Sequence, residues 1–89
     1  MKIISEYRIC SKDGEVNVSL DYKILGVVFR DSYFYAHIMC DTNQLSEKRL
    51  CFYIFEVGDD IKERISQYTY VGFVKTDNSV YHVFCDETQ

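Results

Sequence analysis

The sequence is a succession of short apolar runs, each rich in β-branched and aromatic residues and each ended by turn-forming residues. Such runs are typical of β-strands, because branched and aromatic side chains pack well on a pleated surface. We expect about seven strands, at residues 2–9, 15–20, 23–30, 33–40, 48–57, 68–76 and 80–85. The prediction is a mainly β domain whose antiparallel, strongly twisted sheet curls into a small sandwich or open barrel.

Turn signals suggest how these strands are joined. Residues 11–14 read Ser-Lys-Asp-Gly, residues 31–32 read Asp-Ser, and residues 77–79 read Asp-Asn-Ser, where Asn78 can adopt the left-handed conformation. We therefore expect three hairpins, joining strands one and two, three and four, and six and seven. The run at 23–30 is almost continuously apolar, which indicates a strand buried on both faces.

One segment has a different period. Asp60 and Glu63 have the spacing of a capping box, and Ile61 and Ile65 share one helical face. We expect one or two helical turns there, which would make the fold α+β with one short helix.

The composition indicates one folded domain over residues 1–89. Its 47% hydrophobic content offers enough burial to offset the entropy of ordering, and no linker or internal repeat interrupts the chain. No apolar run approaches the roughly 20 residues of a membrane span, and the beginning of the sequence does not resemble a secretion signal. We expect a cytoplasmic protein whose four Cys are reduced and packed as small hydrophobic residues. The net charge of −4 disfavours direct binding of nucleic acid.

Two His-x-x-Cys segments, starting at His37 and His82, could suggest a zinc site. Both fall in expected strands, where residues three apart point to opposite faces, so one segment cannot supply two ligands. We therefore expect no metal and no cofactor. Neither a nucleophile elbow nor a glycine-rich phosphate loop is present, and we expect no enzymatic activity.

Acidic and tyrosine side chains are the candidate binding residues. Carboxylates cluster at Glu56, Asp59, Asp60 and Glu63, where they either dock on a basic partner or simply form a solvated, helix-capping corner. Tyr33 and Tyr35 would share a strand face with His37 and Met39, and Phe34, Ala36, Ile38 and Cys40 would share the other; one face can form the core and leave the tyrosine face for a partner. Exposed tyrosines are common at interfaces, although they are also ordinary strand residues.

The order of segments resembles an uncharacterised family of small bacteriophage and prophage proteins. The matching features are the opening at 2–7, Lys23-Ile24-Leu25 followed by Val27, Tyr70-x-Gly72, and His82-Val83-Phe84. The chain lacks the Pro and Trp associated with such relatives. The resemblance implies a phage setting, in the cytoplasm of the bacterial host, in which small accessory proteins often inhibit host defence.

The lead hypothesis is a non-enzymatic phage protein, comparable to an anti-CRISPR, that binds a host defence protein through an acidic, tyrosine-rich surface. The alternative is an oligomer that sequesters a signalling nucleotide, with phosphate held by basic residues at Arg30, Lys48, Arg49 and Arg64. A zinc- or thiol-dependent enzyme is a third possibility, to which we give less weight. An unpaired edge strand would also favour a homodimer.

Overall fold

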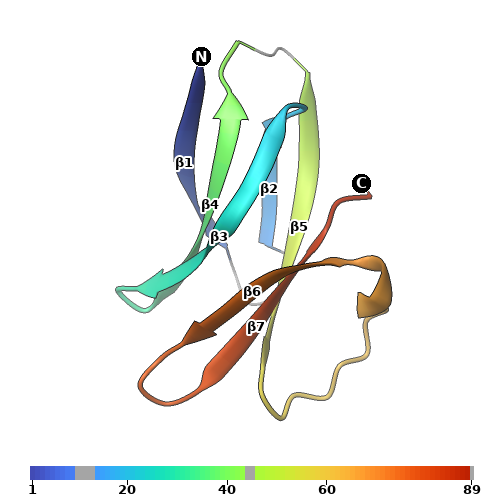
Figure 1. Ribbon diagram of the computed structural model, residues 1–89. Coiled ribbons are helices and arrows are strands. Elements are labelled where there is room, and N and C mark those ends of the chain that lie inside the picture. The colour runs from blue at the N-terminus through green and yellow to red at the C-terminus, as the bar shows by residue number, and fades with distance from the viewer. Residues whose placement is uncertain (10–13, 44–45, 89) are drawn as a thin grey trace.

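The computed structural model describes residues 1–9, 14–43 and 46–88. Its seven strands are β1 (Lys2–Ile9), β2 (Gly14–Ser19), β3 (Tyr22–Arg30), β4 (Tyr33–Asp41), β5 (Glu47–Glu56), β6 (Thr69–Lys75) and β7 (Val80–Asp86). Sheet A has the strand order β1-β4-β3 and sheet B the order β2-β5-β7-β6, and every pairing is antiparallel. The two open sheets pack as a small sandwich (Figure 1), which confirms the predicted fold class. No helix in the described residues is long and apolar enough to cross a membrane.

Alternating side chains build the core between the two sheets. Sheet A contributes Ala36 and Ile38 from its central strand β4, and sheet B contributes Leu50, Phe52 and Val83, all fully buried. The predicted alternation along β4 is confirmed, and the structure shows which face is the core: Ala36, Ile38 and Cys40 are buried, and Phe34 packs against them. The opposite faces of the two sheets are left to the solvent.

The first two strands do not form the expected hairpin. β1 pairs with β4 and β2 pairs with β5, so the chain crosses from sheet A to sheet B after Ile9. Residues 10–13, which carry most of the expected turn, lie outside the described residues, and Gly14 begins β2. The physical reason is burial. Ile9 of sheet A and Val16 of sheet B pack into the same core from its two sides, and two adjacent strands of one sheet would line only one side of it.

The other two expected hairpins are confirmed. Asp31 and Ser32 have φ values of 52° and 70°, the left-handed pair that a two-residue hairpin turn requires. The β6–β7 turn is closed differently, because the Thr76 N–H donates to the Ser79 carbonyl at 2.8 Å. Asn78 does not have a positive φ.

β3 is an edge strand, and the prediction that it is buried on both faces is wrong. Leu25 and Phe29 are 47% and 39% exposed. The register of β3 also shifts between Ile24 and Gly26, so Leu25 forms a bulge. Ile24 and Val27 of this apolar run pack against the core, while other residues of the run are exposed at the edge of the sheet.

The expected helix is absent from the described residues around Asp60. The only helical segment among them is a 3₁₀ turn, η1 (Ile65–Gln67), whose N-cap is Arg64 with no side-chain capping bond. The preceding backbone is used elsewhere: the Asp59 N–H donates to the Glu56 carbonyl at 3.0 Å. A helix here would have had no apolar face to bury, since Ile61 is 39% exposed.

Residues 87 and 88, which follow β7, are held by hydrogen bonds. The Glu87 carboxylate accepts hydrogen bonds from Tyr22 of β3 and Thr69 of β6. These hydrogen bonds lower the pKa of Glu87, and the one from Thr69 has the larger effect. This carboxylate links sheet A to sheet B where their edge strands meet.

Candidate functional site

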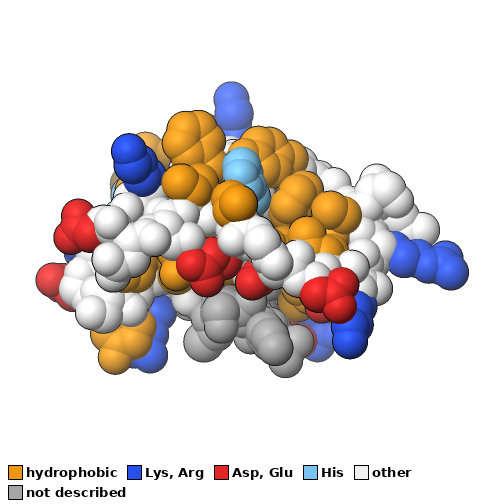
Figure 2. Space-filling model, turned by 90° about the horizontal axis from the view of Figure 1, so that it is seen from below, with side chains coloured by type: hydrophobic (Ala, Val, Ile, Leu, Met, Phe, Trp, Pro, Cys, Tyr) orange, Lys and Arg blue, Asp and Glu red, His pale blue; other side chains and the backbone are white. Residues whose placement is uncertain are grey.

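The outer face of sheet B carries a continuous set of aromatic rings, which we call the aromatic face. It arises because residues that alternate with buried positions of β5 and β7 are themselves aromatic. Its members are Tyr53, Phe55, Tyr68, Tyr70, Phe73, His82 and Phe84. Figure 2 shows hydrophobic side chains gathered around a histidine on the lower side of the molecule.

A bulge in β6 places two of these rings on the same face. Tyr70 pairs with Phe84 and Phe73 pairs with His82, although Tyr70 and Phe73 are three residues apart. The register shift between Tyr70 and Gly72 provides the extra residue, Val71. Gly72 has a φ of +153°, a conformation that residues with a Cβ rarely adopt.

Ring contacts connect the aromatic face from one side to the other. Tyr53 lies nearly parallel to Tyr68, with centroids 4.8 Å apart, and nearly parallel to Phe55 at 6.5 Å. Phe84 follows, with its centroid 6.0 Å from Phe55 and 5.2 Å from Tyr70. These contacts hold the rings of β5 and the start of β6 in fixed orientations.

The far side of the aromatic face is the most exposed. The Tyr70 hydroxyl lies 2.8 Å from His82 Nδ1, a hydrogen bond that fixes the imidazole beside the rings. Phe73 is 66% exposed and Tyr70 is 49% exposed. A large apolar side chain with this exposure has no role in the core and is available to a partner.

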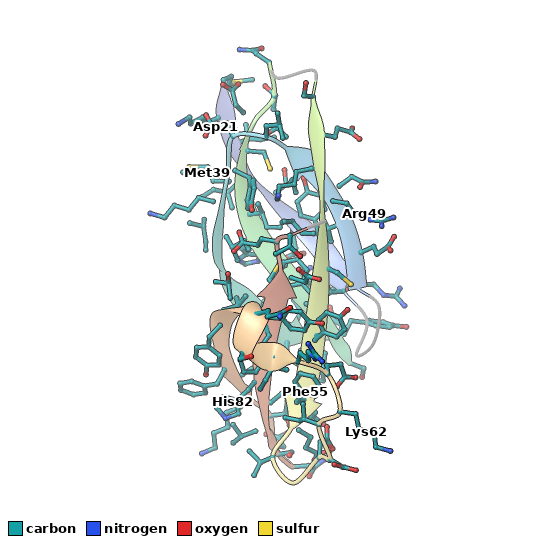
Figure 3. All side chains as sticks on the ribbon, turned by 90° about the vertical axis from the view of Figure 1, so that its right-hand side faces the viewer. Asp21, Met39, Arg49, Phe55, Lys62 and His82 are labelled. Atoms are coloured by element: carbon teal, nitrogen blue, oxygen red, sulfur yellow. The ribbon has the colours of Figure 1, made fainter. Side chains whose placement is uncertain are left out.

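An open hollow of about 440 Å³ lies at the β5 side of the aromatic face. Tyr53 and Phe55 line it from the strand, and Asp59, Asp60 and Glu63 line it from the segment that follows. Figure 3 labels Phe55 on β5 and Lys62 in the segment that follows this strand. We call this feature the acidic hollow, because it combines aromatic side chains with carboxylates.

Local hydrogen bonds shape the acidic rim of the hollow. The Glu56 N–H donates to Asp59 Oδ2 at 2.8 Å, so Asp59 closes the turn that carries the chain out of β5. Asp60 Oδ2 lies 4.0 Å from Lys62 Nζ, and both side chains are more than 80% exposed. In the described residues, Glu63 has no ion pair within this distance. Negative charge on the rim is thus only partly neutralised.

The outer face of sheet A is organised by charge. Tyr33 lies under the guanidinium of Arg8, 3.8 Å from the ring centroid, and Tyr35 lies under Arg30 at 4.3 Å. Arg30 also donates two hydrogen bonds to the Glu6 carboxylate. We call these side chains, together with His37, the sheet A network.

Glu6 is the centre of this network. Its carboxylate lies 2.9 Å from His37 Nε2 on the adjacent strand β4, and it accepts hydrogen bonds from Arg30 on β3, the strand beyond β4. These contacts lower the pKa of Glu6 from 4.5 to about 2, and the hydrogen bond from Arg30 has a larger effect than the one from His37. The tyrosines of sheet A therefore already have cationic partners within the molecule.

A family model described as "Domain of unknown function (DUF7352)" matches residues 1–89. The chain belongs to the DUF7352 family. Neither a curated protein nor a solved structure matches it. The match agrees with the expected resemblance to an uncharacterised family and carries no statement of activity.

The structure of this DUF7352 chain divides the expected binding residues between two sheets. Tyr33 and Tyr35 belong to β4 of sheet A, within the sheet A network. Glu56 ends β5 of sheet B, and the other three carboxylates line the acidic hollow. The tyrosine expected beside the carboxylates is therefore replaced by Tyr53, which sequence reasoning did not select.

The four basic residues expected to hold a nucleotide are dispersed in the DUF7352 fold. Arg30 is engaged by Glu6, and Arg49 lies 3.7 Å from Glu15 in an exposed ion pair. Lys48 precedes Arg49 in β5, so the two side chains point to opposite faces of sheet B. Arg64 lies beyond the strand, before η1. No contact among the described residues joins these four side chains.

The His-x-x-Cys segments split as predicted. Cys40 and Cys85 are buried in the core, while His37 and His82 lie on the outer faces of their sheets. Burial raises the pKa of Cys85 to about 12, so this thiol is not a ready nucleophile. Cys51 is also a buried free thiol, and Cys10 lies outside the described residues. No group of three or more His, Cys, Asp or Glu in the described part of the chain could hold a metal ion.

The aromatic face was missed although part of its signal is local. Tyr53 and Phe55 alternate with buried Phe52 and Ile54, and Phe84 lies between buried Val83 and Cys85. The same alternation rule that selected Tyr33 and Tyr35 would have selected these rings. Their convergence depends on the order β5-β7-β6, which is not visible in the sequence.

Proposed function

We propose that this DUF7352 chain is a non-enzymatic binding protein that holds a basic segment of a partner protein in the acidic hollow. The observation that carries the proposal is the convergence of carboxylates and aromatic rings on one open hollow. Cationic side chains bind such surfaces well, because a guanidinium or ammonium can lie on a ring face while it pairs with a carboxylate.

The charge around the hollow supports a basic partner. Between positions 56 and 63 the chain has four acidic residues, Glu56, Asp59, Asp60 and Glu63, against one basic residue, Lys62. This excess of three negative charges would attract a basic surface and accelerate association at low salt. The exposed rings of the aromatic face, Tyr70 and Phe73, would then supply apolar contact area.

The biological setting we propose is inhibition of a host defence protein during phage infection. Defence proteins that handle nucleic acid present basic surfaces, which match the acidic hollow in charge. In this proposal the DUF7352 chain occupies such a surface and competes with the nucleic acid for it.

The test is capture from a lysate of a bacterium that carries an active defence system. The bait is the intact chain, and the critical variant is Asp60→Asn combined with Glu63→Gln, which removes two charges without removing the Asp59 turn. The matched control is Glu47→Gln combined with Asp77→Asn, which also removes two negative charges, but at positions outside the hollow.

We expect the wild type and the control to retain the same defence protein, and the critical variant to lose it. Binding should also weaken as salt rises from about 0.05 M to 0.5 M, because exposed charges are screened over a few ångströms at high ionic strength. Equal capture by both double variants, or binding that is indifferent to salt, would contradict the proposal. Restored phage growth on a defended strain that expresses the wild type would connect binding to inhibition.

A further inference from the structure

β1 leaves one side of its backbone without a partner in the described residues. It pairs with β4 alone, and the Thr42 N–H donates to the Met1 carbonyl at 2.8 Å. In an antiparallel ladder the groups of alternate residues point to opposite sides, so the odd-numbered residues of β1 bond to β4. The N–H and C=O groups of Lys2, Ile4 and Glu6 therefore point to the free side.

The other edge strands are less available for pairing. β3 and β6 each have a bulge, at Leu25 and Val71, and bulges interrupt the regular ladder that a new strand would need. These two strands also meet where the sheets join, linked through Glu87. β2 is shorter, over Gly14–Ser19, whereas β1 keeps an unbroken register with β4 over its full length. β1 is the edge with the fewest features that prevent strand addition.

The side chains of β1 are suited to a second copy of the same strand. Ile4 is 63% exposed on the outer face, between Lys2 and Glu6 on the same face. In an antiparallel pair centred on Ile4, each Ile4 lies opposite the other, and each Lys2 lies opposite a Glu6. This arrangement joins an apolar contact with two pairs of opposite charge.

Other symmetric registers are poorer. A pair centred on Ser5 places Lys2 opposite Arg8, and a pair centred on Glu6 places two carboxylates opposite each other. A pair centred on Ile3 is shorter and leaves Glu6 without a cation opposite. Charge complementarity thus selects one register.

We propose that the chain forms a symmetric homodimer in which β1 pairs antiparallel with the partner's β1, with Ile4 on the twofold axis. The two copies of sheet A then form one continuous sheet, and the exposed isoleucines bury each other. Both acidic hollows belong to sheet B, which this pairing leaves open. The dimer would present two identical hollows, although its formation does not depend on what they bind.

Charge substitution at the twofold axis tests both the dimer and its register. Ile4→Lys and Ile4→Glu each place like charges opposite each other, and each should raise the dimer dissociation constant at least about tenfold. An equimolar mixture of the two variants should dimerise again, because Lys and Glu then meet across the axis. Val57→Lys is the matched control, because Val57 is 66% exposed and lies outside β1.

Sedimentation velocity over a concentration series gives the result, with circular dichroism to show that each variant is folded. We expect a dimer for the wild type and Val57→Lys, monomers for each Ile4 variant alone, and a heterodimer in the mixture. A wild type that stays monomeric at every concentration overturns the dimer. A mixture that stays monomeric, or an Ile4→Lys protein that dimerises as well as the wild type, overturns the register.

Discussion

The outer faces of the two sheets use aromatic residues in opposite ways. On sheet A, the rings of Tyr33 and Tyr35 are each covered by a guanidinium, and the arginine over Tyr35 is tied to Glu6. On sheet B, rings contact rings, and the most exposed of them, Phe73, lies with its ring centroid 6.3 Å from that of His82. An exposed aromatic residue therefore indicates a binding surface only when its cross-strand neighbours leave it without a partner.

The two faces also differ in what they contribute to stability. The sheet A network is largely exposed, and exposed ion pairs contribute at most about 1 kcal/mol each. Stacked and edge-on ring pairs contribute about 0.5–1.5 kcal/mol beyond the apolar area that they bury. We expect the centre of the aromatic face to matter more for folding than the tyrosines of sheet A.

The largest effect should come from Phe84→Ala, because Phe84 contacts Phe55 on one side and Tyr70 on the other. We expect the free energy of unfolding to fall by about 2–3 kcal/mol, less than for a fully buried Phe because Phe84 is only half-buried. Urea denaturation measures it. Tyr33→Ala on sheet A is the comparison and should cost less than about 1 kcal/mol. A larger loss for Tyr33→Ala would reverse the contrast between the faces.

Gly72→Ala should have the next largest effect, because the φ of +153° is strained for alanine. No atom lies within 4 Å of the added Cβ, so the cost of about 1–3 kcal/mol comes from the backbone alone. The near-ultraviolet circular dichroism of the rings should also change, since Tyr70 and Phe73 depend on this bulge.

Gly26→Ala is the matched control, since Gly26 occupies the corresponding place after the bulge of β3, at φ +158°. It should lower stability to a similar extent and leave the ring signal of sheet B unchanged. If both substitutions changed that signal equally, the bulge of β6 would not be what orients the aromatic face.

Local patterns predicted the strands and the direction of their side chains. Ala36 and Ile38 are buried while Tyr35 and His37 face outward, as strict alternation requires. The turn at Asp31-Ser32 was also predictable, because the two strands it joins are adjacent in the sequence. These features depend on contacts between residues close in the chain.

Features set by distant contacts were not predictable. The sequence does not show that β1 pairs with β4, because that choice depends on which arrangement buries Ile9 and Val16 in one core. The capping-box spacing at Asp60 and Glu63 predicted a helix that lacks a surface to pack on. Local alternation would have selected Tyr53 and Phe55 as outward-facing, but their position beside the carboxylates of the acidic hollow depends on the path of the chain after β5.

Glu6→Gln should change how stability depends on pH. The native pKa of Glu6, about 2, lies below its ordinary value of 4.5, so the contribution of this carboxylate is present above pH 4.5 and is lost as the pH falls towards 2. The variant should therefore lose less stability than the wild type across that interval, measured by urea denaturation at several pH values. Glu47→Gln, outside the sheet A network, is the control, and its free energy of unfolding should depend on pH as it does in the wild type. If the free energy of unfolding of Glu6→Gln depended on pH as it does in the wild type, the sheet A network would not be stabilising the Glu6 carboxylate.

Phe73→Ser should have the smallest effect on folding and a clear effect on binding. Phe73 is 66% exposed at the edge of the aromatic face, beside His82, so the free energy of unfolding should change by less than about 0.5 kcal/mol. A partner seated on the acidic hollow and the rings beyond it would lose the apolar area of this side chain, and its dissociation constant should rise about tenfold. The corresponding change on sheet A, Tyr33→Ser, should leave the dissociation constant unchanged, because Arg8 already covers that ring. If Tyr33→Ser weakened binding and Phe73→Ser did not, sheet A would be the docking face and its arginines would have to move aside on binding.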